Sequence, residues 1–182
     1  MNPKTRLLFL AVPAALVAGI SIGAVFSAHS DTASLFSAAK ESFASPTLFS
    51  DSLGKALRQN LITVFLLWIF GTTPLGSLPA AIVVGVRGFS VGQAVGALVN
   101  SFGLRGFFAA VSGIFPHNLF YVPFLCLLAM FAIRYSLGVD RQRSLFKYSI
   151  TALLLALPVL LGCFVEGYIS APLFRAVLGA YV

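Results

Sequence analysis

The most informative part of this chain is residues 59–86, which read QNLITVFLLWIFGTTPLGSLPAAIVVGV. This run of 28 residues between Arg58 and Arg87 contains no charged side chain. About 20 apolar residues are enough for a helix to cross the roughly 30 Å hydrocarbon layer of a bilayer. The run is too long for one upright helix, and glycine and proline cluster near its middle, where they break helices. It therefore predicts two transmembrane helices joined by a turn at Thr72–Pro79.

The composition of the whole chain indicates the same environment. Charged residues make up 9% and apolar residues 59% of the 182 residues, whereas ordinary globular domains carry about 25% charged residues. The net charge of +7 does not indicate nucleic-acid binding, because the basic residues lie at the edges of apolar runs and not on one polar face. We expect a protein of the cell membrane whose partner is the lipid bilayer, with no nucleic acid.

The hydropathy pattern predicts an all-α, polytopic integral membrane protein that forms one membrane domain over residues 1–182. The first apolar run is longer than the roughly 7–15 residues of a signal-peptide core, so we interpret it as a retained signal anchor. Five transmembrane helices are predicted. They cover about residues 7–28, 60–78, 80–99, 118–134 and 148–170.

Two segments between these helices are predicted to lie at the membrane surface. Residues 29–59 repeat apolar side chains at helical spacing with polar side chains on the other face. That pattern is typical of an amphipathic helix in the interface, and it equally suits a docking surface for a partner helix. Residues 104–117 alternate apolar side chains with Gly, Pro and Arg105, which favours a short re-entrant or interfacial segment.

The basic residues predict the orientation. Lys4 and Arg6 precede the first span, and the loop 134–147 is also strongly basic. Such segments remain in the cytoplasm, and five spans place both of them on the same side. We therefore expect a cytoplasmic N-terminus and an extracytoplasmic C-terminus.

Two of the predicted spans carry small residues at intervals of four. Small side chains allow helix backbones to approach closely in lipid, so we expect both stripes to contact another helix, within the chain or in a homo-oligomer. The first stripe contains Ala11, Ala15, Gly19, Gly23 and Ser27, and the second contains Gly88, Gly92, Gly96 and Asn100.

A few polar side chains inside or beside the spans are candidates for a function, because ionisable groups in a bilayer are costly. Arg87 is interpreted as an anchor that extends to the cytoplasmic face. His117 and Glu166 are expected near the outer face at similar depth, where they could pair. Glu166 is predicted to point into the bundle toward a polar partner from residues 100–121. Within that segment, Arg105 is the alternative to His117. The two remaining candidate positions are Asn60 and Asn100.

The sequence contains no recognisable catalytic signature. It has no His-Glu-x-x-His, no Gly-x-Ser-x-Gly, no P-loop and no pair of carboxylates within the membrane. A catalytic alternative uses His117 as a base with Ser112 or Ser170 as nucleophile. Cys126 and Cys163 are interpreted as small core residues. We expect a protein that is not an enzyme, with no catalytic residue, no cofactor and no metal site.

Several short motifs, taken in their order along the chain, resemble the stage II sporulation protein M family. They are Gly71 with its small-residue turn, Gly88-Phe89-x-x-Gly92, Pro116-His117, and Glu166 before Ile169-Ser170-Ala171-Pro172. The family has five spans, with Asn-Gly-Phe-x-x-Gly in the third and Pro-His-Gly-x-x-Glu entering the fourth. The chain departs from these motifs at three positions. It has Arg87 where the family usually has Asn, Asn118 where the family has Gly, and Tyr121 where the family has Glu.

The resemblance implies a membrane scaffold that recruits peptidoglycan-degrading partners during engulfment in spore formers. Under this hypothesis the partners are other membrane or envelope proteins, and residues 29–59 form the docking region. Because Tyr121 replaces the family's Glu, His117 loses a carboxylate partner. Glu166 is then the remaining acidic residue of these motifs. The alternative function is a transporter, channel or lipid-handling membrane protein, because interrupted helices such as those at residues 72–79 and 112–123 often frame binding sites.

Overall fold

The computed structural model describes residues 3–29, 49–139, 144–170, 172–173 and 176–177. Within these ranges every regular element is a helix, and five helices are long and apolar enough to cross a membrane. The predicted class, an all-α polytopic membrane protein, is therefore confirmed. The five helices are α1 (Pro3–Ala28), α3 (Phe49–Thr72), α4 (Ser77–Phe102), α6 (Phe115–Ser136) and α7 (Leu145–Val165).

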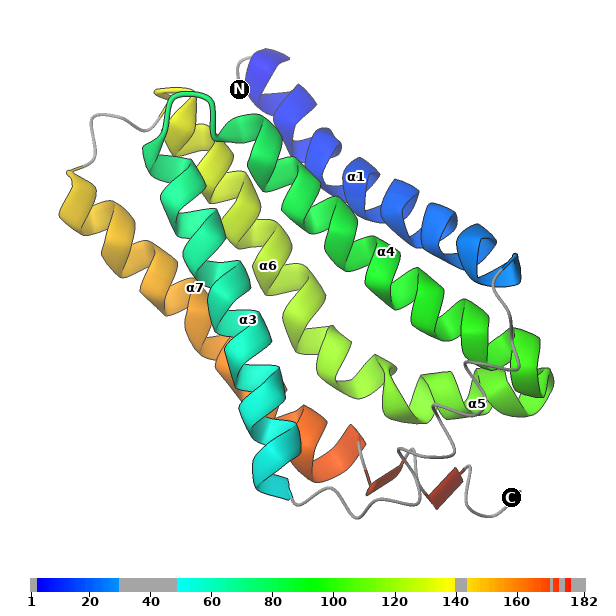
Figure 1. Cartoon of the computed structure of the whole chain (residues 1–182). Helices are drawn as coiled ribbons and strands as arrows, with labels where there is room; N and C mark the ends of the chain where they lie inside the picture. The colour runs from blue at the N-terminus through cyan, green and yellow to red at the C-terminus, as the bar shows by residue number, and fades with distance from the viewer. Residues whose placement is uncertain (1–2, 30–48, 140–143, 171, 174–175, 178–182) are drawn as a thin grey trace.

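The long helices run side by side as a bundle, with α1 along the outside of α4 (Figure 1). Helix α6 is central, since it contacts α1, α3, α4, α5 and α7. The short helix α5 (Leu104–Gly113) lies across one end of the bundle, and the π-helix η1 (Glu166–Ser170) continues α7 beside it. We call this end the α5 end. The opposite end, which holds the α3–α4 turn and the last residues of α6, is called the turn end.

The two stripes of small residues face each other and join α1 to α4. A Cβ atom added to Gly19 would collide with the carbonyl oxygen of Gly85, and one added to Gly92 would collide with that of Ile20. Asn100 extends the contact, because its Nδ2 donates to Ser27 Oγ at 3.4 Å. The close approach that the stripes predict is thus found within one chain, and it positions α4 for the site described below.

Helix α3 begins and ends earlier than the predicted span 60–78. It starts at Phe49 and ends at Thr72, so the last part of the predicted surface segment 29–59 belongs to a transmembrane helix. Residues 30–48 lie outside the described residues. The polar Asn60, at which the predicted span begins, lies inside α3. Its side chain is buried and bonded to other groups within the bundle.

The turn after α3 is shorter than the predicted turn Thr72–Pro79. Only residues 73–76 lie between α3 and α4, and the backbone N–H of Gly76 donates to the Thr73 carbonyl oxygen at 3.1 Å. Pro79 falls in the first turn of α4. Proline is tolerated there because the first four N–H groups of a helix have no partner within the helix.

The predicted segment 104–117 is divided between two elements. Helix α5 ends at Gly113, and α6 already begins at Phe115, with Pro116 at its start. His117 and Asn118 therefore lie in the first turn of a transmembrane helix and not in the surface segment. The other four long helices also begin before the predicted residues 7, 80, 118 and 148, and α4 and α6 end after the predicted 99 and 134. Helix α7 ends at Val165, and η1 covers the rest of the predicted span to Ser170.

Candidate functional site

A group of polar side chains lies inside the bundle toward the α5 end, and we call it the polar cluster. Its members come from α3, α4, α6, α7 and η1, so residues more than a hundred positions apart meet there. They are Asn60, Arg87, His117, Asn118, Tyr121, Cys163, Glu166 and Ser170.

Tyr121 and Glu166 form the central contact of the polar cluster. The Tyr121 hydroxyl donates a hydrogen bond to Glu166 Oε2 at 2.8 Å, and the Tyr121 side chain is completely buried. Gly162, one turn before Glu166 on α7, leaves room for the ring, since a Cβ atom there would meet Tyr121 Cε1 at 2.5 Å. A carboxylate inside a bilayer needs a polar partner, and Tyr121 supplies one.

His117 contacts Ser170 and not Glu166. The distance from His117 Nδ1 to Ser170 Oγ is 3.0 Å, and the edge of the imidazole faces the Tyr121 ring with 5.4 Å between centroids. The expected pairing of His117 with Glu166 is therefore replaced by two parallel contacts. The contacts Tyr121–Glu166 and His117–Ser170 both join α6 to η1. His117 and Glu166 therefore lie near the same end of the bundle, as predicted.

Asn118 lies beside His117 at the edge of the polar cluster. Its Nδ2 donates to the Ile114 carbonyl oxygen at 2.8 Å and lies 3.3 Å from His117 Nε2. Its Oδ1 is buried and has no hydrogen-bond partner among the described residues. The side chain thus has an unused acceptor.

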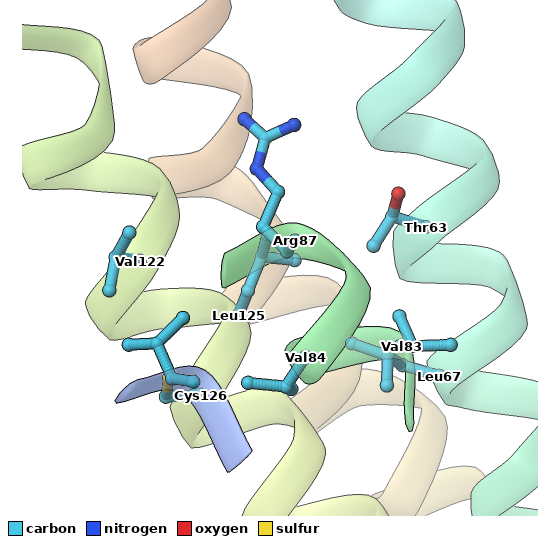
Figure 2. Close-up of a pocket in the computed structure, with 9 residues that line it drawn as sticks. Thr63, Leu67, Val83, Val84, Arg87, Val122, Leu125 and Cys126 are labelled. Atoms are coloured by element: carbon cyan, nitrogen blue, oxygen red, sulfur yellow. The ribbon is translucent and has the colours of Figure 1, made fainter. Parts of the chain in front are cut away.

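Arg87 lies inside the bundle, and the interpretation of Arg87 as a cytoplasmic anchor is wrong. Its guanidinium carbon lies 4.9 Å from the centroid of the Tyr121 ring, an arrangement in which the ring face attracts the cation. Figure 2 shows the guanidinium extending away from the apolar side chains of Val84 and Leu125. The side chain is directed at the Tyr121 ring, and the ring and the charge of Glu166 offset part of the cost of burying the guanidinium.

The cavity next to Arg87 is small and apolar. It has a volume of about 10 Å³, and eight other residues line it, including Leu67, Val84 and Leu125 (Figure 2). A volume of about 10–15 Å³ holds at most one water molecule. The cavity is therefore a packing defect of the size of one water molecule and not a substrate pocket.

Asn60 joins α3 to α7. Its Nδ2 donates to the Ala56 carbonyl oxygen at 2.9 Å and contacts Cys163 Sγ at 3.7 Å. The side chain is only 2% exposed, and its Oδ1 has no partner among the described residues. Cys163, which we interpreted as a small core residue, is fully buried and also takes part in this polar contact.

The remaining candidate residues lie outside the polar cluster. Arg105 is exposed in the first turn of α5. Asn100 links α4 to α1 through Ser27. Ser112, considered as a nucleophile, donates to the Ala109 carbonyl oxygen within its own helix at 3.1 Å.

Sequence reasoning missed the roles of Tyr121 and Ser170. The comparison of motifs indicates only that Tyr121 replaces a carboxylate, yet Tyr121 lies one helical turn after His117 and on the same face. Ser170 follows Glu166 by four residues in the same way. These spacings were a usable signal, because residues four apart on a helix are neighbours.

The cluster is suited to joining helices. Among the described residues no group of three His, Cys, Asp or Glu side chains is arranged to hold a metal ion. The polar contacts instead run between elements: α6 to η1 twice, α3 to α7, and α4 to α6. Each contact offsets part of the cost of placing a polar group in hydrocarbon.

Five apolar helices with a buried polar cluster define a multi-pass α-helical membrane protein. The family described as Stage II sporulation protein M matches residues 11–171, which is most of the chain. The chain therefore belongs to this family, as the sequence motifs suggested. No curated protein matches the chain significantly. No solved structure matches it significantly either.

Proposed function

We propose that this protein is a non-enzymatic membrane scaffold that assembles other membrane or envelope proteins. Membership of the Stage II sporulation protein M family supports this proposal. In that setting the partners are peptidoglycan-degrading proteins, and the process is engulfment in spore formers. The lipid bilayer is the medium in which the assembly takes place.

The observation that carries the proposal is the use of the buried polar groups. The Tyr121 hydroxyl, the His117 ring and the Asn60 amide each contact a residue on another element. Binding and catalytic sites keep such groups directed at an open space where a substrate can enter. Here they hold neighbouring helices together, which is what a rigid assembly platform requires.

The alternative of a transporter or channel receives less support. Small-molecule sites usually have volumes of about 300–1,000 Å³, whereas the cavity beside the intramembrane Arg87 has about 10 Å³ and an apolar lining. A transport site near the midplane needs polar groups around a space that a solute can fill. The surroundings of Arg87 are packed instead with side chains such as Leu67 and Leu125.

The orientation is part of the proposal. The basic loop after α6 and the basic residues before Leu7 favour a cytoplasmic turn end under the positive-inside rule. The α5 end, with the polar cluster close to it, then faces the extracytoplasmic side. Partners that act on the cell wall lie on that side of the membrane.

The scaffold proposal is tested by chemical crosslinking in intact membranes, followed by affinity purification of the full chain. We expect one or a few envelope proteins to be recovered in amounts comparable with the protein itself. A five-span membrane protein of unrelated function, expressed at the same level, is the control for nonspecific capture. Recovery of the intact protein alone, under conditions that preserve an established membrane complex, would contradict the proposal.

A further inference from the structure

Helices α5 and α6 meet at Ile114, which lies between Gly113, the last residue of α5, and Phe115, the first residue of α6. Two groups of Asn118 bond to the Ile114 carbonyl oxygen. The side-chain Nδ2 donates at 2.8 Å, whereas the backbone N–H donates at 3.4 Å, a length beyond the usual range of such bonds. The Asn118 side chain therefore makes the shorter and stronger of the two bonds at this junction.

The contacts of Asn118 also determine where His117 carries its proton. A carbonyl oxygen can only accept, so Nδ2 and not Oδ1 of the amide must face Ile114. The same Nδ2 lies 3.3 Å from His117 Nε2, and because an amide nitrogen only donates, Nε2 must be the acceptor. His117 is therefore neutral in this arrangement. Its proton is on Nδ1, which donates to Ser170 Oγ at 3.0 Å.

A proton added to His117 Nε2 would place one N–H group against another. The Oδ1 atom of Asn118 is buried and has no hydrogen-bond partner among the described residues. Turning the amide over would direct Oδ1 at the new N–H and form a charge-assisted hydrogen bond. The same turn would bring Oδ1 against the Ile114 carbonyl oxygen, so the 2.8 Å bond would be lost. Asn118 can serve one of these two neighbours but not both.

The charges that act on His117 come from two elements. Glu166 of η1 favours a proton on the imidazole, whereas Arg87 of α4 and the burial of the ring oppose it. Tyr121 of α6 and Cys163 of α7 are uncharged members of the polar cluster, and the cationic side chains of α3 and α5, which are Lys55, Arg58 and Arg105, are exposed. Histidine is the side chain that changes charge near neutral pH, because its ordinary pKa is about 6.5.

We infer that His117 and Asn118 form a proton-sensitive hinge between α5 and α6. At neutral pH the Asn118 amide holds the Ile114 carbonyl, and α5 is fixed to the start of α6. When His117 Nε2 takes a proton from water at the α5 end, the amide turns to the imidazole and the junction loosens. Because Nδ1–H donates to Ser170 in both states, η1 keeps its contact while α5 becomes mobile. Under the proposed orientation the hinge responds to acid on the extracytoplasmic side.

The test is the mobility of a nitroxide spin label on the full chain in lipid nanodiscs, whose two faces are both open to the buffer. The label is attached at Val111→Cys, which is 45% exposed on α5, while Cys126 and Cys163 are buried. Since the loosened state binds one more proton, we expect the mobile fraction to rise at least about threefold between about pH 7.5 and about pH 5. The matched control is Ile169→Cys on η1, which is 47% exposed and should keep the same spectrum.

Three substitutions identify the group that titrates. His117→Gln removes the proton site and should leave the α5 label immobile throughout. Asn118→Ala removes the side-chain bond to Ile114, so the α5 label should be as mobile at about pH 7.5 as the unsubstituted hinge is at about pH 5. Glu166→Gln removes the charge that favours protonation. The response should then remain and move to lower pH by about half a pH unit or more.

A second measurement keeps the hinge testable if one of these variants does not fold. The chain has two histidines, His29 and His117. Nitrogen-15 NMR of the labelled imidazoles in nanodiscs reports which ring nitrogens carry a proton, and His29→Gln identifies the two signals. We expect His117 to carry its proton on Nδ1 alone at about pH 7.5 and to be protonated on both nitrogens at about pH 5.

Four results would contradict the hinge. The first is a His117 ring that stays neutral down to about pH 5, and the second is a ring that gains its proton while the α5 label stays immobile. The third is a response that survives in folded His117→Gln or disappears in folded Glu166→Gln, since another group would then titrate. The fourth is an equal response at Val111 and Ile169, which would indicate general loosening. The hinge is independent of the proposed scaffold function, which is tested by partner recovery.

Discussion

The Tyr121 hydroxyl donates a 2.8 Å hydrogen bond to Glu166, while the face of the same ring lies 4.9 Å from the Arg87 guanidinium carbon. Tyr121 therefore stands between an intramembrane cation and an intramembrane anion. Among the described residues Arg87 and Glu166 form no direct ion pair, although their charges lie within electrostatic range. The Tyr121 side chain thus contacts both charged groups and links α6 to α4 and to η1.

The first prediction concerns the hydroxyl of Tyr121. Tyr121→Phe keeps the ring under Arg87 but leaves the Glu166 carboxylate without its donor. We expect the free energy of unfolding to fall by about 1–2 kcal/mol, between the value for an average membrane hydrogen bond and that for a charged group. Thermal or denaturant unfolding in lipid nanodiscs measures it. Tyr135→Phe is the control, because the Tyr135 hydroxyl has no hydrogen bond among the described residues, and an equal loss there would contradict the assignment.

A second prediction concerns the acid itself. Glu166→Gln retains an acceptor for the Tyr121 hydroxyl, whereas Glu166→Leu removes this acceptor from a buried hydroxyl. We expect the Gln variant to lie within about 1 kcal/mol of the wild type and the Leu variant to lose about 1–3 kcal/mol. Limited proteolysis of η1 should report the same order. A Leu variant as stable as the Gln variant would show that Glu166 does not hold η1 to α6.

The contact between α1 and α4 leads to a third prediction. Gly92→Leu places a side chain against the backbone of Ile20, which cannot move aside without separating the two helices. We expect a loss of about 3 kcal/mol or more, or a failure to fold. Ser90→Leu is the matched control, because Ser90 is exposed on the same helix. Yields of folded protein in membranes and unfolding temperatures distinguish the two variants. A harmless Gly92→Leu would refute the packing argument.

The orientation of the bundle can be tested with single cysteines. Leu75 is 85% exposed at the turn end, and Leu104 is 74% exposed at the α5 end. Cys126 and Cys163 are buried and should remain unlabelled. A membrane-impermeant maleimide should label Leu104→Cys on intact cells and Leu75→Cys only after permeabilisation. The reverse pattern would show that the turn end is extracytoplasmic.

Hydropathy and charge predicted the class of this protein, because the bilayer imposes length and composition on each helix separately. The start of α3 is predicted wrongly at residue 60, because the polar Asn60 is buried inside the helix, where its side chain contacts Cys163, 103 residues away along the chain. The stripes of small residues were visible in the sequence. That Gly19 faces Gly85 depends on how the helices are arranged, which no local pattern specifies.

The polar cluster was predicted only in part. Glu166 was expected to find a polar partner between residues 100 and 121, and Tyr121 is that partner. The prediction that Arg87 anchors the helix at the membrane surface is wrong because a long cationic side chain can reach either that surface or an interior ring. Only the position of Tyr121 relative to α4 decides between these two outcomes.

The central claim is that the polar cluster holds helices together and that function comes from assembly. A double-mutant cycle of Tyr121→Phe and Glu166→Leu, measured for stability and for partner recovery in the same membranes, tests this claim most directly. We predict a coupling of about 0.5–1 kcal/mol between the two positions, and partner recovery that falls only in proportion to the folded fraction. Fully folded variants without coupling, in which partner recovery is abolished, would contradict the claim, because these side chains would then act on a partner or substrate directly.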